Sequence, residues 1–136
     1  MPKFRLIQHT ADIGLTASGK TLAEAFGNAA YGMFSITTDL RKVREKESRT
    51  VELKSAQPET LLFDWLNSLI YFFDVEGMLF KRFDVELSGE SQLKATCHGE
   101  KYDPSRHDLK LGVKSATYHM LSVDAGKNRV RVIFDV

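Results

Sequence analysis

The chain is 136 residues long, a length that suits one domain and leaves little room for a second. Hydrophobic residues make up 43% and charged residues 27% of the sequence, a balance that excludes a long disordered region. The 19 Lys and Arg residues are matched by 18 Asp and Glu, so the net charge of +1 gives no strong positive field, and any RNA contact would be local or indirect.

The cysteine content and the apolar segments indicate a cytoplasmic protein. Cys97 is the single cysteine, so no intrachain disulfide can form, and the first residues lack the apolar stretch of a signal peptide. The longest apolar region, residues 61–75, is interrupted by Asp64 and Asp74 and is too short to span a bilayer. We therefore expect no membrane segment.

The first half of the chain predicts two strands followed by a helix. Residues 4–7 and 13–17 suit short strands. Thr21 and Glu24 have the spacing of a capping box, which marks the start of a helix. Apolar residues then recur at steps of three and four up to residue 36, which places them on one helical face: Leu22, Ala25, Phe26, Ala29, Met33 and Ile36.

The middle of the chain predicts a strand and a second helix. Residues 41–49 carry charges of both signs and favour a solvated loop or the entry to a strand at 50–54. Pro58 suits the first turn of the second helix, and Gly77 ends it. The apolar face of this helix is formed by Leu62, Trp65, Leu66, Leu69 and Phe73.

From residue 81 onward the apolar period changes to two, which is typical of strands. We expect strands at residues 83–87, 93–97, 109–113, 116–123 and 130–134, separated by turns. Two helices among mainly antiparallel strands predict an α+β single domain over residues 1–136, with both helices packed on one face of a sheet.

Polar residues gather at His9, Thr10 and Asp12, where the first strand ends. Thr10 or Asp12 could simply cap a turn, with His9 at the surface, or the three could form part of a site. Asp135 is also ambiguous, because it could be an exposed acid paired with Arg131 or a carboxylate directed into a site. The residues alone leave both interpretations open.

Lys114 follows a predicted strand and would point away from its apolar row. A solvated lysine is one interpretation, and a polar site with Tyr118 and His119 is another. Cys97 alternates with apolar residues as an inert core thiol does, and Trp65 has the spacing of a core residue. No zinc-ligand pair, phosphate-binding Gly-rich loop or nucleophile elbow occurs, so a self-contained enzyme is not expected.

Carboxylates are the groups most available for chemistry, and they suit hard divalent cations such as Ca²⁺, Mg²⁺ or Mn²⁺. Bringing Asp12, Asp39 and Asp135 together would raise their pKa values unless a cation balanced the charge. The sequence does not show that the three meet in space.

Ordered motifs at both ends of the chain resemble those of the archease family. They cover residues 9–14, 19–26, 29–34, 38–39, 113–119 and 132–136. The order, the spacing and the total length all agree with that family, while residues 41–103 contribute only pattern.

Archeases are small partners of the RtcB-type RNA ligase, which joins RNA ends with GTP and a divalent metal after tRNA introns are removed. The resemblance implies that this chain speeds guanylylation of the ligase and its repeated turnover, without sealing RNA itself. By position, Asp12 and Asp135 match metal-coordinating acids, with Ca²⁺ the first candidate, and Lys114 matches a lysine implicated in activity. Asp39 and His9 belong to the signature, and their roles stay open.

Two other classes of function remain. The chain could be a chaperone-like protein modulator that needs no metal, or a metal-dependent hydrolase that acts alone. The second lacks a recognisable general base.

Overall fold

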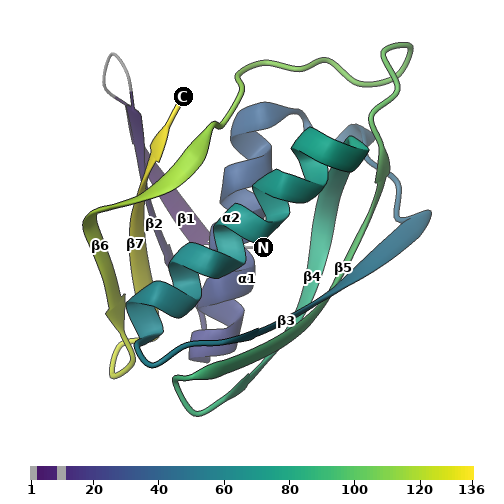
Figure 1. Ribbon diagram of the computed structural model, residues 1–136. Helices are drawn as coiled ribbons and strands as arrows, with labels where there is room; N and C mark the ends of the chain where they lie inside the picture. The colour runs from purple at the N-terminus through teal and green to yellow at the C-terminus, as the bar shows by residue number, and fades with distance from the viewer. Residues whose placement is uncertain (1–2, 9–11) are drawn as a thin grey trace.

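The computed structural model, which describes residues 3–8 and 12–136, combines helices with antiparallel strands, and its last four strands follow one another without a helix between them (Figure 1). The helices of this part are α1 (Leu22–Thr37), α2 (Pro58–Glu76) and the short 3₁₀ helix η1 (Leu40–Lys42). Its strands are β1 (Lys3–Gln8), β2 (Asp12–Ser18), β3 (Glu47–Lys54), β4 (Met78–Ser88), β5 (Gln92–Lys101), β6 (Ser115–Asp124) and β7 (Arg129–Asp135). The predicted α+β fold class is confirmed.

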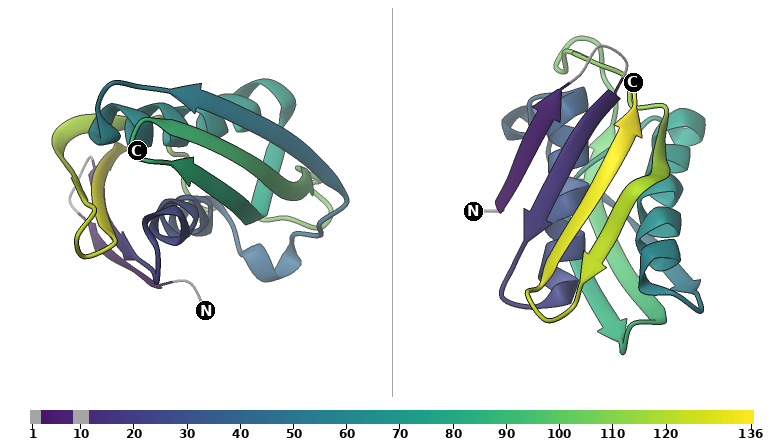
Figure 2. Two further views of the ribbon diagram at one scale, coloured as in Figure 1. Left: turned by 90° about the horizontal axis from the view of Figure 1, so that it is seen from below. Right: turned by 90° about the vertical axis from the view of Figure 1, so that its left-hand side faces the viewer.

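The strands form two antiparallel sheets rather than the one expected. One has the order β1-β2-β7-β6 and the other the order β3-β5-β4. The helices lie between them, as the view from below shows (Figure 2, left). Helix α1 packs against β2 of one sheet and β4 of the other, and α2 packs against β6 and β3. Both sheets and both helices therefore contribute to the same core.

Local chemistry fixes the helix ends. The Thr21 hydroxyl accepts a hydrogen bond from the Glu24 N–H, and the Glu24 carboxylate accepts one from the Lys20 N–H. Helix α2 begins at Pro58 and ends at Gly77, whose φ of 72° is left-handed. Of the helices in residues 3–8 and 12–136, none has the length and apolarity to cross a membrane.

The helices are joined by a buried hydrogen bond. Trp65 is fully buried, and its indole N–H donates to the Phe26 carbonyl at 3.0 Å. Burial of a side chain of this size stabilises the fold by roughly 1.5–3 kcal/mol. The prediction that Trp65 and Cys97 are core residues is confirmed, because both are fully buried.

The strand predicted at residues 109–113 is wrong. This segment has no strand partner and belongs to an irregular connection between β5 and β6. The Lys110 N–H donates to the Thr37 carbonyl at 2.8 Å, and the Asp108 carbonyl accepts from the Thr38 hydroxyl at 2.8 Å. Backbone groups of this connection therefore form hydrogen bonds with the end of α1 instead of with a neighbouring strand.

Candidate cation site at one end of the four-stranded sheet

Strands β2 and β7 place Asp12 directly opposite Asp135 at one end of the four-stranded sheet. Directly opposite residues of an antiparallel pair point to the same face, with Cβ atoms about 4.5–5.5 Å apart. Asp12 is half-buried and Asp135 is exposed. Two acids from the opposite ends of the chain are thus neighbours on one surface.

The two acids carry like charge with little compensation nearby. No ion pair among the described residues involves either one. Among the described residues, the Asp135 carboxylate accepts only a long hydrogen bond of 3.5 Å, from the Ser115 hydroxyl. Like charges that face each other across strands destabilise a sheet, and a bound cation would remove this repulsion. The oxygen-only donors fit a hard divalent cation.

Lys114 is fixed beside this pair by its backbone. Its N–H donates to the Asp135 carbonyl at 2.8 Å, and the next residue, Ser115, pairs with Asp135 across β6 and β7. The Lys114 side chain is exposed at the same end of the sheet. An exposed lysine and two acids therefore lie at the same end of the sheet.

Asp39 does not join them. It caps η1, where its carboxylate accepts from the Arg41 N–H at 3.1 Å and forms an ion pair with the Arg41 guanidinium at 2.8 Å. The hydrogen bonds from the Arg41 side chain and backbone lower the pKa of Asp39 to about 2. Within residues 3–8 and 12–136, no three His, Cys, Asp or Glu side chains gather closely enough to hold a metal ion. His9 lies outside the described residues.

A buried polar cluster lies at the end of β5, and the sequence did not predict it. Glu100 is 4% exposed and accepts hydrogen bonds from the Arg44 N–H, the Arg106 guanidinium and His107 Nε2 at 2.8–2.9 Å. His107 Nδ1 accepts from the Asp103 N–H at 2.9 Å, so the neutral ring carries its proton on Nε2. The sequence signal here was only a turn at residues 103–105. The cluster anchors the start of the connection that leads to Lys114.

Comparisons with known proteins agree with the fold. The archease protein family model matches residues 4–136. Protein archease of Sulfurisphaera tokodaii is 40% identical over 100% of this chain and 99% of its own, and protein archease of Methanosarcina mazei is 39% identical over 98% and 96%.

Two solved structures share the architecture. The solution structure of Methanobacterium thermoautotrophicum protein 1598 has a TM-score of 0.84 and 36% identity, covering 98% of each chain. The crystal structure of an archease, possible chaperone, from Thermotoga maritima has a TM-score of 0.58 over 96% of this chain and 94% of its own. The latter is 21% identical and supports the fold alone.

Proposed function

Because the chain belongs to the archease family, we propose that it promotes guanylylation and repeated turnover of a GTP-dependent RtcB-type RNA ligase in tRNA splicing. Its role is accessory: it lends groups to the ligase and does not seal RNA itself. The observation that supports this proposal is the Asp12–Asp135 pair with Lys114 fixed beside it.

The paired acids would hold the cation. Ca²⁺ takes about 6–8 oxygen ligands, so the two carboxylates leave positions for water and for oxygens of a partner, and Mg²⁺ or Mn²⁺ also suits such donors. A bound cation would supply positive charge that stabilises phosphate oxygens. Asp12 and Asp135 would hold it at an end of the sheet where Asp135 is exposed.

Lys114 would act next to the cation, on the phosphate groups of the ligase's nucleotide. Its backbone bond to Asp135 fixes where the side chain begins, and the exposed ammonium can extend toward a docked partner. Phosphoryl transfer depends mainly on positioning and on charge stabilisation, which are the contributions an accessory protein can make.

The test is a time course of ligase guanylylation with Asp135→Ala. We expect the stimulation to be lost, with cation affinity lowered by about tenfold or more because one of two neighbouring carboxylates is removed. Calorimetric titration with Ca²⁺, Mg²⁺ and Mn²⁺ measures the affinity and identifies the cation. Asp74→Ala is the matched control, since Asp74 is an exposed acid on α2. Stimulation that is unchanged in Asp135→Ala would refute the proposed mechanism.

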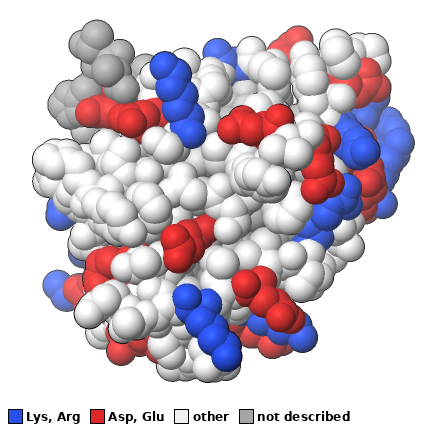
Figure 3. All heavy atoms as spheres, in the orientation of Figure 1, with Lys and Arg blue, Asp and Glu red and all other residues white. Residues whose placement is uncertain are grey.

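A second candidate is a metal-independent chaperone-like modulator, a role that the name of the Thermotoga maritima structure suggests for that protein. A broad uncharged area on the face that carries α2 favours it (Figure 3). Tyr71 and Val75 of α2 are also each 61% exposed. Stimulation of the ligase that survives Asp12→Ala, and that persists when this chain alone is stripped of metal with a chelator before mixing, would support this alternative. Incubation with RNA and GTP alone tests for an activity of the chain's own, and we expect no product.

A further inference from the structure

The four-stranded sheet has one face on the helices and the other open to solvent (Figure 2, right). Buried and exposed residues alternate along β7, so Val130, Val132 and Phe134 face the core. Arg129, Arg131 and Ile133 therefore line the open face.

Arginines from two strands form a row on this face. Arg5 pairs with Thr16, and Thr16 pairs with Arg131. The backbones of the two arginines are therefore two strand spacings apart, about 10 Å. Arg129 lies two residues from Arg131 on the same face, about 7 Å along β7. All three arginines are exposed.

Two lysines extend the row at the end of the sheet opposite the acid pair. The turn after β2 carries Lys20 and the turn before β7 carries Lys127, both exposed. Hydrogen bonds join the turns, from the Gly19 N–H to the Asn128 carbonyl at 3.1 Å and from the Asn128 amide to the Lys20 carbonyl at 2.9 Å. We call Arg5, Lys20, Lys127, Arg129 and Arg131 the basic face.

The charges of the basic face have little compensation. The ion pairs of the described residues lie elsewhere, and none involves the basic face. They involve η1 and its cap Asp39, strands β3, β4 and β5, residue 45, Glu76 of α2 and residues 106–108. Asp124 is opposite Arg129 in register but accepts a hydrogen bond from the Lys127 N–H and forms no ion pair. A local positive surface thus exists on a chain whose net charge is only +1.

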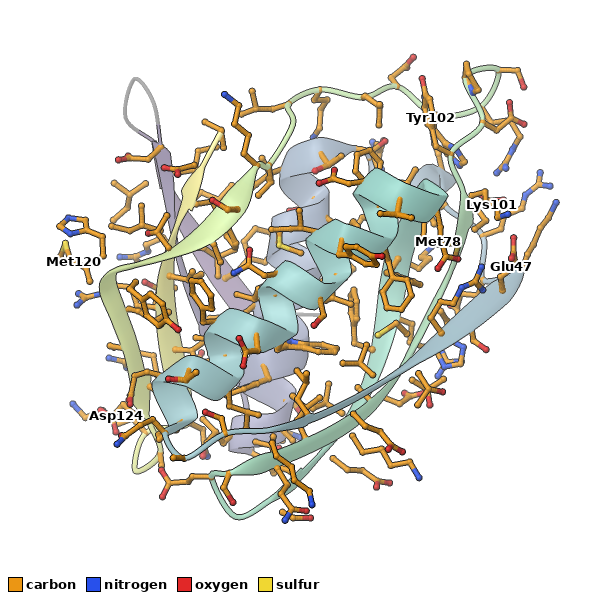
Figure 4. All side chains as sticks on the ribbon, in the orientation of Figure 1. Glu47, Met78, Lys101, Tyr102, Met120 and Asp124 are labelled. Atoms are coloured by element: carbon orange, nitrogen blue, oxygen red, sulfur yellow. The ribbon has the colours of Figure 1, made fainter. Side chains whose placement is uncertain are left out.

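A hollow of about 160 Å³ connects the basic face to the acid pair. Gly14 leaves it open, and Ile7, Ile133 and Met120 are among its lining residues. Met120 lies where β6 bends out of register, with a φ of 53°, and it points away from the helices (Figure 4). The Arg131 side chain holds this bend through a 3.0 Å bond to the Met120 carbonyl.

We propose that the basic face binds the phosphate backbone of single-stranded RNA and that the hollow at Gly14 receives one unstacked base. Three arginines on the open face and two lysines at its end, none of them in an ion pair with another described residue, match the repeated charge of a polynucleotide, and bound phosphates displace counterions. Single-stranded RNA presents unstacked bases to apolar walls. The choice of RNA over other polyanions rests on the proposed function.

The residues that line the hollow determine how tightly we expect RNA to bind. Its apolar walls are aliphatic, so the base gains less than it would by stacking on aromatic rings, and charge dominates. Binding should therefore be weak, with a dissociation constant on the order of 1–100 µM, and it should weaken steeply with salt.

The first test measures the anisotropy of a labelled oligo-uridine with Arg5→Glu/Arg129→Glu. Neither side chain makes an ion pair within the described part of the chain, so the fold should persist, and a thermal melt checks this. We expect the affinity at low salt to fall by about tenfold or more and the slope of log affinity against log salt to shrink by about 1.4. The control, Lys46→Glu/Lys54→Glu, makes the same charge change at exposed lysines elsewhere and should retain most of the affinity.

The second test fills the hollow with Gly14→Val. A Cβ at Gly14 would lie 3.5 Å from the Ile7 carbonyl oxygen and 3.7 Å from the Ile7 Cβ, which are ordinary van der Waals distances. We expect weaker RNA binding with an unchanged salt slope, because no charge is altered.

Two outcomes would overturn the proposal. One is RNA binding by Arg5→Glu/Arg129→Glu that equals the binding of the control. The other is competition by polyglutamate as effective as competition by unlabelled RNA, which would make this a surface for an acidic protein. None of these assays contains the ligase, so their failure is distinct from failure of the proposed ligase activation.

Discussion

Glu100 shows how one buried carboxylate can stay ionised. Burial is the largest single influence and raises its pKa, but hydrogen bonds from the Arg44 backbone, Arg106 and His107 outweigh burial and bring the pKa down to about 2. A carboxyl group whose pKa is lower in the folded state than the ordinary 4.5 stabilises the fold above that value. This contribution is lost as the pH falls from 4.5 toward 2.

Glu100→Gln should therefore destabilise the protein at neutral pH by about 2–4 kcal/mol, because it leaves buried donors without a charged acceptor. Urea unfolding at neutral pH and at several values down to the acid range measures this. The difference from wild type should shrink as the pH falls, since protonation removes the same charge from the wild type. Glu86→Gln, an exposed site on β4, is the control. A difference that stays constant with pH would contradict the assigned pKa.

The pairing of β4 with β5 depends on a close approach between their backbones. Gly99 of β5 is buried, and a Cβ there would lie 2.8 Å from the Phe80 Cα and overlap the Leu79 carbonyl. The register of the two strands shifts between Phe80 and Arg82, next to this contact. Backbone atoms of β4 cannot move aside as a flexible side chain can, so the position requires glycine.

Gly99→Ala should cost about 3 kcal/mol or more, at the upper end of overpacking effects, because β4 must move. Gly112→Ala is the matched control: a Cβ there has no atom within 4 Å, and the change should stay within about 0.5 kcal/mol. Urea unfolding of both variants provides the comparison. Equal stabilities would show that β4 and β5 adjust more easily than the structure indicates.

The connection between β5 and β6 shows why a local pattern can mislead. Residues 109–113 alternate as a strand does, yet Leu109 is 45% exposed and Val113 is buried. Instead, the Asp108 carbonyl accepts a hydrogen bond from Thr38, and the Lys110 N–H donates one to Thr37, at the end of α1. The spacing of apolar residues in a sequence shows which side chains can share a face. It does not show which distant backbone group is available as a hydrogen-bond partner.

For the whole molecule, the sequence predicted what is decided locally. Caps such as Thr21, the helix end at Gly77 and the period of two predicted α1, α2 and the seven strands, but not the short helix η1. The division into two sheets depends on long-range pairings such as β2 with β7, which no local pattern encodes. For the same reason, the Asp12–Asp135 pair was expected only through the family motifs, and the cluster around Glu100 was not expected.

Cys97 offers a test of whether both sheets unfold together. It is fully buried in the shared core, and burial raises the pKa of its thiol to about 12, so the native state supplies almost no reactive thiolate. Modification by a thiol reagent at mildly alkaline pH should be slower than in urea by about 10³-fold or more, since it requires global opening.

Glu100→Gln should then raise the rate of Cys97 modification by about tenfold for each 1.4 kcal/mol of stability lost. The two residues belong to the same strand, β5, but only global unfolding links the urea measurement to the labelling rate quantitatively. Cys97→Ala sets the background of the assay. Rapid modification of the wild type in native buffer would show that the three-stranded sheet opens on its own, and that the shared core does not unfold as one unit.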